Sequence, residues 1–148
     1  VLGSLLIAAC QSGTAGDEAA VEMVSGSDQC GRDEAALLWV EAPPDLPAGA
    51  GSIADASQPA LKAGDSILLV YLGQKPTPGY GAALRGAAVT GDRLEVDLEA
   101  REPDPGAMLA QVITRPCVAL RVPSEVRAGE VAVSMDAEGF PLTHRIPD

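Results

Sequence analysis

The spacing of apolar and polar residues predicts short β-strands and little helix. The most hydrophobic stretch, residues 67–72, is rich in β-branched and aromatic side chains and lies between glycines, which predicts a strand buried on both faces. In residues 93–101 apolar side chains alternate with charged ones, so this strand is expected to have one buried and one solvated face. Further strands are predicted at residues 32–41, 82–89, 111–122, 131–135 and 140–146.

The predicted strand at 111–122 is interrupted by Pro116, which implies a sheet edge or a bulge at that point. After the proline, successive side chains are expected on opposite faces of the strand. One face would carry Val118, Leu120 and Val122, and the other Cys117, Ala119 and Arg121.

Short strands separated by glycine and proline predict an all-β domain, either a sandwich or a partly open barrel of short antiparallel strands. This domain is expected to span residues 32–148. Residues 11–31 mix Ser, Gly, Ala, Asp and Glu without periodicity, which predicts a flexible tether. Between the first two predicted strands, residues 53–62 are expected to form a short helical turn limited by Pro59.

The uncharged apolar run at residues 1–9 is followed directly by Cys10. It is shorter than the roughly 20 residues that span a bilayer, but it suits the apolar part of a secretory signal. Residues 6–10, LIAAC, resemble a bacterial lipobox, so residues 1–10 are predicted to be the end of a signal peptide with Cys10 as the lipidation site. Gln11 resembles an outer-membrane sorting signal, which places the protein in the bacterial cell envelope, anchored at the periplasmic face of the outer membrane. An ordinary cleaved signal or a loose apolar tail is the alternative.

The two cysteines that remain are Cys30 and Cys117. In an oxidising compartment such a pair favours a disulfide over two unpaired thiols, and this bridge would tie the start of the domain to the strand after Pro116.

Composition and charge exclude some functions. The net charge is −11, with 10 basic against 21 acidic residues, so the chain lacks the basic surface that nucleic-acid binding requires. Glu95, Asp97 and Glu99 point along a line rather than toward one point, which indicates a solvated face and not a cation site.

Candidate catalytic residues are few. His144 is the one histidine, and neither a G-x-S-x-G nor an H-E-x-x-H motif occurs. Cys117 could be activated by the nearby Arg115, but the disulfide is the stronger expectation. Glu102 and Asp104 flank a proline without a recognisable glycan cleft. We therefore expect a non-enzymatic protein without cofactor or metal, although an enzyme using His144 is a third hypothesis.

The segment GQKPTPGY at residues 73–80 follows the most hydrophobic strand. Its two prolines fix φ and lack amide donors, and its second glycine permits a turn with positive φ, so a stiff projecting loop is expected. A stiff loop loses little entropy on binding. We predict that it contacts a partner through Lys75, Pro76, Thr77, Pro78, Gly79 and Tyr80. In the alternative interpretation the loop is only a turn, and Tyr80 fills the core.

The same loop carries a family resemblance. Together with LEVDL at 94–98, EPDPGAM at 102–108 and QVITRPCVALRVP at 111–123, it resembles the PrcB C-terminal domain family over residues 66–123, although Pro78 stands where that family usually has glycine. The resemblance implies a lipid-anchored accessory protein that binds or stabilises another envelope or exported protein, with a secreted subtilisin-like protease as the candidate partner. The loop at 102–108 would lie close to this partner.

A second resemblance, to chagasin-like inhibitors of cysteine proteases, supplies an alternative function. Thr77, Gly79 and Tyr80 match the first inhibitory loop of that family, and Arg115 and Pro116 match part of the second. The same loop would then fill an active-site cleft. An envelope lipoprotein with another, non-enzymatic role is the remaining alternative.

Overall fold

The computed structural model describes residues 17–41 and 64–147, and all regular elements in these two ranges are β-strands. The predicted lipobox, the first part of the predicted tether and the predicted helical turn at 53–62 lie outside the described residues. The strands are β1 (Asp17–Glu18), β2 (Glu22–Ser27), β3 (Ala35–Glu41), β4 (Ser66–Leu72), β5 (Gly81–Thr90), β6 (Arg93–Arg101), β7 (Cys117–Val122), β8 (Glu130–Met135) and β9 (Leu142–Arg145). None of the described residues form a helix long and apolar enough to span a bilayer.

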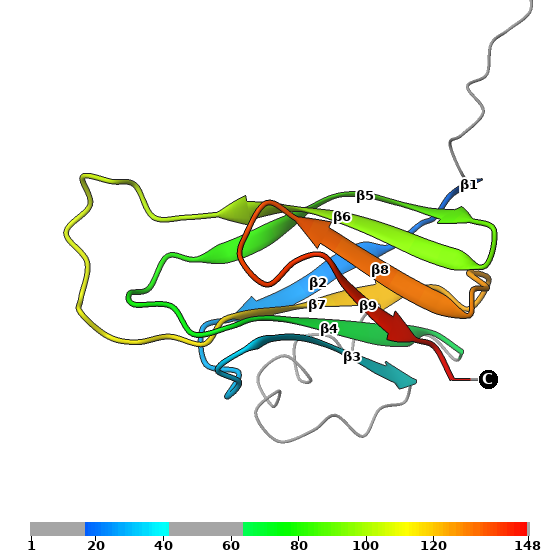
Figure 1. The fold of residues 1–148 in the computed structure, drawn as a ribbon, viewed down its shortest axis with the longest axis horizontal. Helices are drawn as coiled ribbons and strands as arrows, with labels where there is room; N and C mark the ends of the chain where they lie inside the picture. The colour runs from blue at the N-terminus through cyan, green and yellow to red at the C-terminus, as the bar shows by residue number, and fades with distance from the viewer. Residues whose placement is uncertain (1–16, 42–63, 148) are drawn as a thin grey trace, which may run out of the picture.

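The strands form two sheets that pack face to face as a sandwich (Figure 1). The five-stranded sheet has the order β1-β5-β6-β8-β9, and the four-stranded sheet has the order β2-β7-β4-β3. The prediction of an all-β sandwich is confirmed. The expectation of purely antiparallel pairing is wrong at one point, because β6 and β8 are parallel. After β6 the chain crosses to the four-stranded sheet as β7 and then returns as β8, so β6 and β8 run in the same direction.

Strand β4 is buried on both faces, as its continuous apolar sequence predicts. It lies inside the four-stranded sheet, between β7 and β3. Ile67, Leu69 and Tyr71 form a cluster on the face away from the other sheet. The opposite face joins the main core, which is formed by Leu68, Val70 and Leu72 of β4, Leu94, Val96 and Leu98 of β6, Val118, Leu120 and Val122 of β7, and Val131, Val133 and Met135 of β8.

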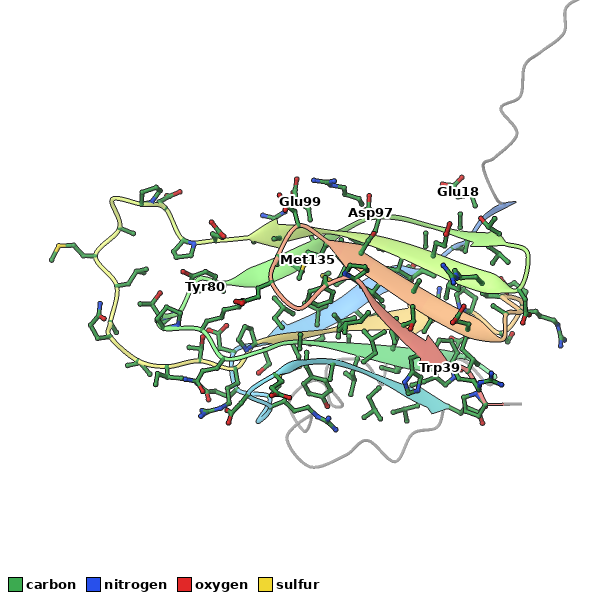
Figure 2. The ribbon with its side chains drawn as sticks, in the orientation of Figure 1. Glu18, Trp39, Tyr80, Asp97, Glu99 and Met135 are labelled. Carbon is green, nitrogen blue, oxygen red and sulfur yellow. A yellow bond between two sulfur atoms is a disulfide. The ribbon has the colours of Figure 1, made fainter. Side chains whose placement is uncertain are left out.

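The alternation predicted for residues 93–101 is confirmed in β6, where alternate residues are buried and exposed. Asp97 and Glu99 point away from the sandwich (Figure 2). Arg85 of the neighbouring strand lies 3.9 Å from Asp97 and 3.7 Å from Glu99. Because these side chains are about half exposed, the ion pairs contribute little to stability. The acidic face of β6 is therefore a solvated face, as predicted.

The predicted tether at 11–31 is wrong in its second half. Residues 22–27 form β2, which pairs with β7 at the edge of the four-stranded sheet, and residues 17–18 pair with the end of β5. The ordered domain therefore begins well before residue 32. The sequence of β2, EMVSGS, resembles a linker in composition, but the edge of β7 supplies its backbone hydrogen-bond partners.

Pro116 is not at a sheet edge, but the pairing register changes by one residue around it, from Tyr71–Cys117 to Lys75–Thr114, as at a bulge. It directly precedes β7, which lies between β2 and β4. At this position its missing N–H costs no ladder hydrogen bond. Its carbonyl accepts a hydrogen bond from the Leu72 amide at 2.9 Å, so the proline closes the end of the β4–β7 ladder.

A buried ion pair joins the other end of the four-stranded sheet. The guanidinium of Arg121 lies 3.0 Å from Asp65, whose side chain is 3% exposed, and 3.0 Å from the exposed Glu22. The hydrogen bond with Asp65 is the main cause that raises the pKa of Arg121 above its usual value. Because the folded chain raises this pKa, the stabilising effect on the Arg121 cation is lost only when the pH rises through the raised value.

The predicted disulfide between Cys30 and Cys117 is present, with a Cα–Cα distance of 5.9 Å. It joins the segment after β2 to the first residue of β7. Both cysteines are buried. The Cys30 amide also donates to the Arg115 carbonyl at 2.9 Å, so a covalent bond and a hydrogen bond hold this part of the chain.

Candidate functional site

Two connections between the sheets lie at one end of the sandwich, at the left of Figure 1. Residues 73–80, in green, join β4 to β5, and residues 102–116, in yellow, join β6 to β7. Since β4 pairs with β7 and β5 pairs with β6, both connections begin and end next to each other. We call the surface formed by residues 73–80 and 102–116 the loop end.

Hydrogen bonds hold the two loops together. The Lys75 amide donates to the Thr114 carbonyl at 2.8 Å, and the Thr114 amide donates to the Lys75 carbonyl at 2.9 Å. The Thr114 hydroxyl, which is buried, donates to the Thr77 carbonyl at 3.1 Å. Thr114 therefore fixes both Lys75 and Thr77, and it is a site residue that the sequence analysis did not identify. Thr77 is one of the predicted contact residues, and its hydroxyl donates to the Pro78 carbonyl at 3.1 Å.

Gly79 makes the second contact between the loops. Its φ is +103°, a backbone conformation that residues with a Cβ atom rarely adopt. A Cβ atom at this position would lie 2.8 Å from Cβ of Pro103. The turn therefore needs glycine both for its backbone angle and for the close approach of the second loop. Residues 73–80 are therefore held against the second loop by hydrogen bonds and by this close approach.

Substituting Gly79 by alanine should lower the free energy of unfolding by about 2 kcal/mol, because it adds overpacking against Pro103 to the cost of positive φ. Gly91 is a matched control, since its φ is +64° and no atom lies within 4 Å of the place where its Cβ would be. Gly91→Ala should cost about 1 kcal/mol or less. The measurement is urea unfolding of both variants. Equal losses would contradict the role assigned to the contact with Pro103.

Lys75 and Tyr80 are half-buried and lie together. The Lys75 ammonium nitrogen is 5.6 Å from the centre of the Tyr80 ring, a cation–π contact. Tyr80 directly precedes β5, at the loop end (Figure 2). It is not a fully buried core residue as Tyr71 is, so part of it remains available at the surface. Of the two flanking prolines, Pro76 is exposed and Pro78 is half-buried.

The large hydrophobic side chains that the described residues expose lie on the second loop. Met108 is 99% exposed, Val112 50% and Ile113 49%. Residues 112 and 113 belong to the strand predicted at 111–122, and this part of the prediction is wrong because β7 begins only at Cys117. Exposed apolar residues gathered on one loop are typical of an interaction surface.

The other candidate residues have different positions. Arg115 forms an ion pair with Asp33, and its amide donates to the Asp28 carbonyl at 2.8 Å. Pro116 is buried, so this pair lies at the base of the second loop. His144 is half-buried in β9, opposite Val131. Within residues 17–41 and 64–147, no group of three or more His, Cys, Asp or Glu side chains is arranged to hold a metal ion.

Residues 66–123 match the family model described as PrcB C-terminal. No curated protein and no solved structure gives a match. The matched segment contains β4, β5, β6 and β7 together with both connections of the loop end. Over residues 66–123 the chain therefore carries the PrcB C-terminal family signature, which confirms the resemblance seen in its sequence.

Proposed function

We propose that this protein is a PrcB-like accessory module that binds another envelope or exported protein through the loop end. The observation that carries this proposal is the exposure of Met108, Val112 and Ile113 on a loop held in place by Thr114. Ordering a flexible loop costs binding free energy, and the two ends of this loop are held in advance by the hydrogen bonds of Thr114 and by the close approach of Pro103 to Gly79.

The loop end combines features that are common in binding surfaces. Tyr80 offers a half-buried aromatic anchor, and Lys75 offers a charge beside it. The family signature covers both loops and supports a PrcB-like role. An exported protease is the partner that this role suggests. Lipid attachment at Cys10 would hold the module at the periplasmic face of the outer membrane, close to exported proteins.

Replacing Met108, Val112 and Ile113 together by serine should weaken partner binding at least 100-fold, because the exposed apolar contact is lost. The test uses the lipidated protein to capture partners from its native envelope, followed by affinity measurement with the purified partner. Since the three side chains are exposed, the melting temperature should stay the same. A matched control is Glu125→Ser with Arg127→Ser, two exposed residues at the opposite end of the sandwich.

Capture by the wild type and the control but not by the triple variant would support binding through the loop end. Equal capture by all three proteins would contradict it. If the partner is a protease, its peptide hydrolysis should continue in the complex. Abolished hydrolysis would instead favour the inhibitor alternative.

A further inference from the structure

A pocket of about 190 Å³ opens beside the 73–80 loop. It lies where β4, β5, β6 and β8 end or begin, next to the turn that follows β8. Its apolar lining includes Leu72, Ala100, Met135 and Ala137. At roughly 30 Å³ for each water molecule, the pocket has room for about six waters, which is space for one side chain and not for a length of peptide.

Charged side chains surround this apolar lining. Lys75 and Arg101 supply two cations, and Glu102 and Glu138 supply two carboxylates. Tyr80 forms the wall beneath the Lys75 ammonium group. The pocket could therefore accept an anion or a cation, and the choice depends on which of these charges is held in place.

Lys75 is the charge that the structure fixes. Its backbone is bound on both sides by Thr114, and its ammonium group lies over the Tyr80 ring. Glu102 and Glu138 are exposed and, among the described residues, form no hydrogen bond or ion pair, so both can turn to the solvent. An ion held in advance loses less entropy on binding than one that must be ordered.

Within the described residues four arginines are paired with carboxylates, whereas Lys75 and Arg101, the two cations of the pocket, are not. Arg85, Arg93, Arg115 and Arg121 are paired with carboxylates. Lys75 forms no such pair within the described residues, although acidic residues outnumber basic ones by 21 to 10 in this chain. Its positive charge thus remains available at the edge of an apolar pocket.

We propose that this pocket binds the C-terminal residue of the partner, with an aliphatic side chain in the apolar lining and the terminal carboxylate on Lys75 and Arg101. A terminal residue carries both groups on a single Cα atom, which matches a small apolar pocket with cations at its rim. Capture of a terminal carboxylate is a known mode of peptide recognition. This inference rests on the function proposed above, because it identifies the part of the partner that the loop end binds.

The test is an NMR titration of the folded chain with three leucine derivatives. N-acetyl-leucine carries the carboxylate, N-acetyl-leucine amide is neutral, and leucine amide is a cation. N-acetyl-leucine should shift the amide signals of Tyr80, Gly81, Ala100 and Ala137, which lie around the pocket, and the other two compounds should not. Lys75→Met should weaken its binding at least tenfold. Arg145→Met, which removes an exposed cation at the other end of the sandwich, should leave it unchanged.

Equal shifts with the neutral amide, preference for the cation, or no shifts at the pocket would each overturn the proposal. The serine variant of Met108, Val112 and Ile113 separates it from the proposed function. That variant should still bind N-acetyl-leucine while it loses the partner. If N-acetyl-leucine does not bind but partner capture still requires the three apolar residues, the pocket proposal fails and the binding role of the loop end stands.

Discussion

Replacing Cys30 and Cys117 together by alanine should lower the free energy of unfolding by about 2–5 kcal/mol. The disulfide joins residues 87 positions apart, and cross-linking so long a loop removes much of the conformational entropy of the unfolded chain. The chain-entropy relation gives about 4.6 kcal/mol for a loop of this length. Both cysteines are buried, so alanine also removes packing in their cluster with Ile67, Leu69 and Tyr71.

Guanidinium unfolding under non-reducing conditions measures this loss. The control is the wild type with a reductant, which should become less stable, whereas the alanine variant should not respond to the reductant. Equal stability of the oxidised wild type and the variant would contradict a stabilising role for the bridge. The backbone hydrogen bond from residue 30 to the Arg115 carbonyl does not use the side chain, so the measured loss reports the bridge and the packing of its sulfur atoms.

Replacing Arg121 by methionine should lower the free energy of unfolding by about 3 kcal/mol, in the lower part of the range for broken buried ion pairs. The substitution keeps much of the side-chain volume but removes the cation that lies 3.0 Å from the buried Asp65. A buried carboxylate without this cation is costly. The raised pKa of Arg121 has the same physical origin, namely its hydrogen bond with Asp65.

Arg93→Met is the matched control for this prediction. Arg93 pairs with Glu130 at 3.0 Å, but both side chains are more than 40% exposed, so its loss should cost less than about 1 kcal/mol. Both variants would be compared by urea unfolding. Similar small losses for Arg93→Met and Arg121→Met would show that burial does not strengthen the pair.

Strands with a clear pattern of apolar residues could be predicted from the sequence, because that pattern determines which faces of the strand are buried. Residues 67–72 are apolar throughout and are buried on both faces of the sheet. In residues 93–101 apolar and charged side chains alternate, and only the apolar face is buried. Strand β2 could not be predicted in this way. Its serine, glycine and glutamate residues form a strand because the edge of β7 binds their backbone.

The loop end was only partly predictable for a similar reason. The composition of 73–80 indicates a stiff turn, but it does not show that Thr114 binds this turn or that Pro103 packs against Gly79. Val112 and Ile113 have the β-branched side chains of a strand, yet they lie outside both sheets and are exposed. Contacts between segments distant in the sequence decide these features.

The family signature occupies a particular place in the sandwich. It supplies β4 and β7, the two inner strands of the four-stranded sheet, together with β5 and β6 of the other sheet. Strands from outside the signature flank it, with β3 beside β4, β2 beside β7, β1 beside β5 and β8 beside β6. A fragment limited to 66–123 would expose these four strand edges and lose the core residues of β8. The matched segment is therefore the inner part of the sandwich: it carries both loops at one end, and it relies on strands from outside 66–123 to cover its edges and complete its core.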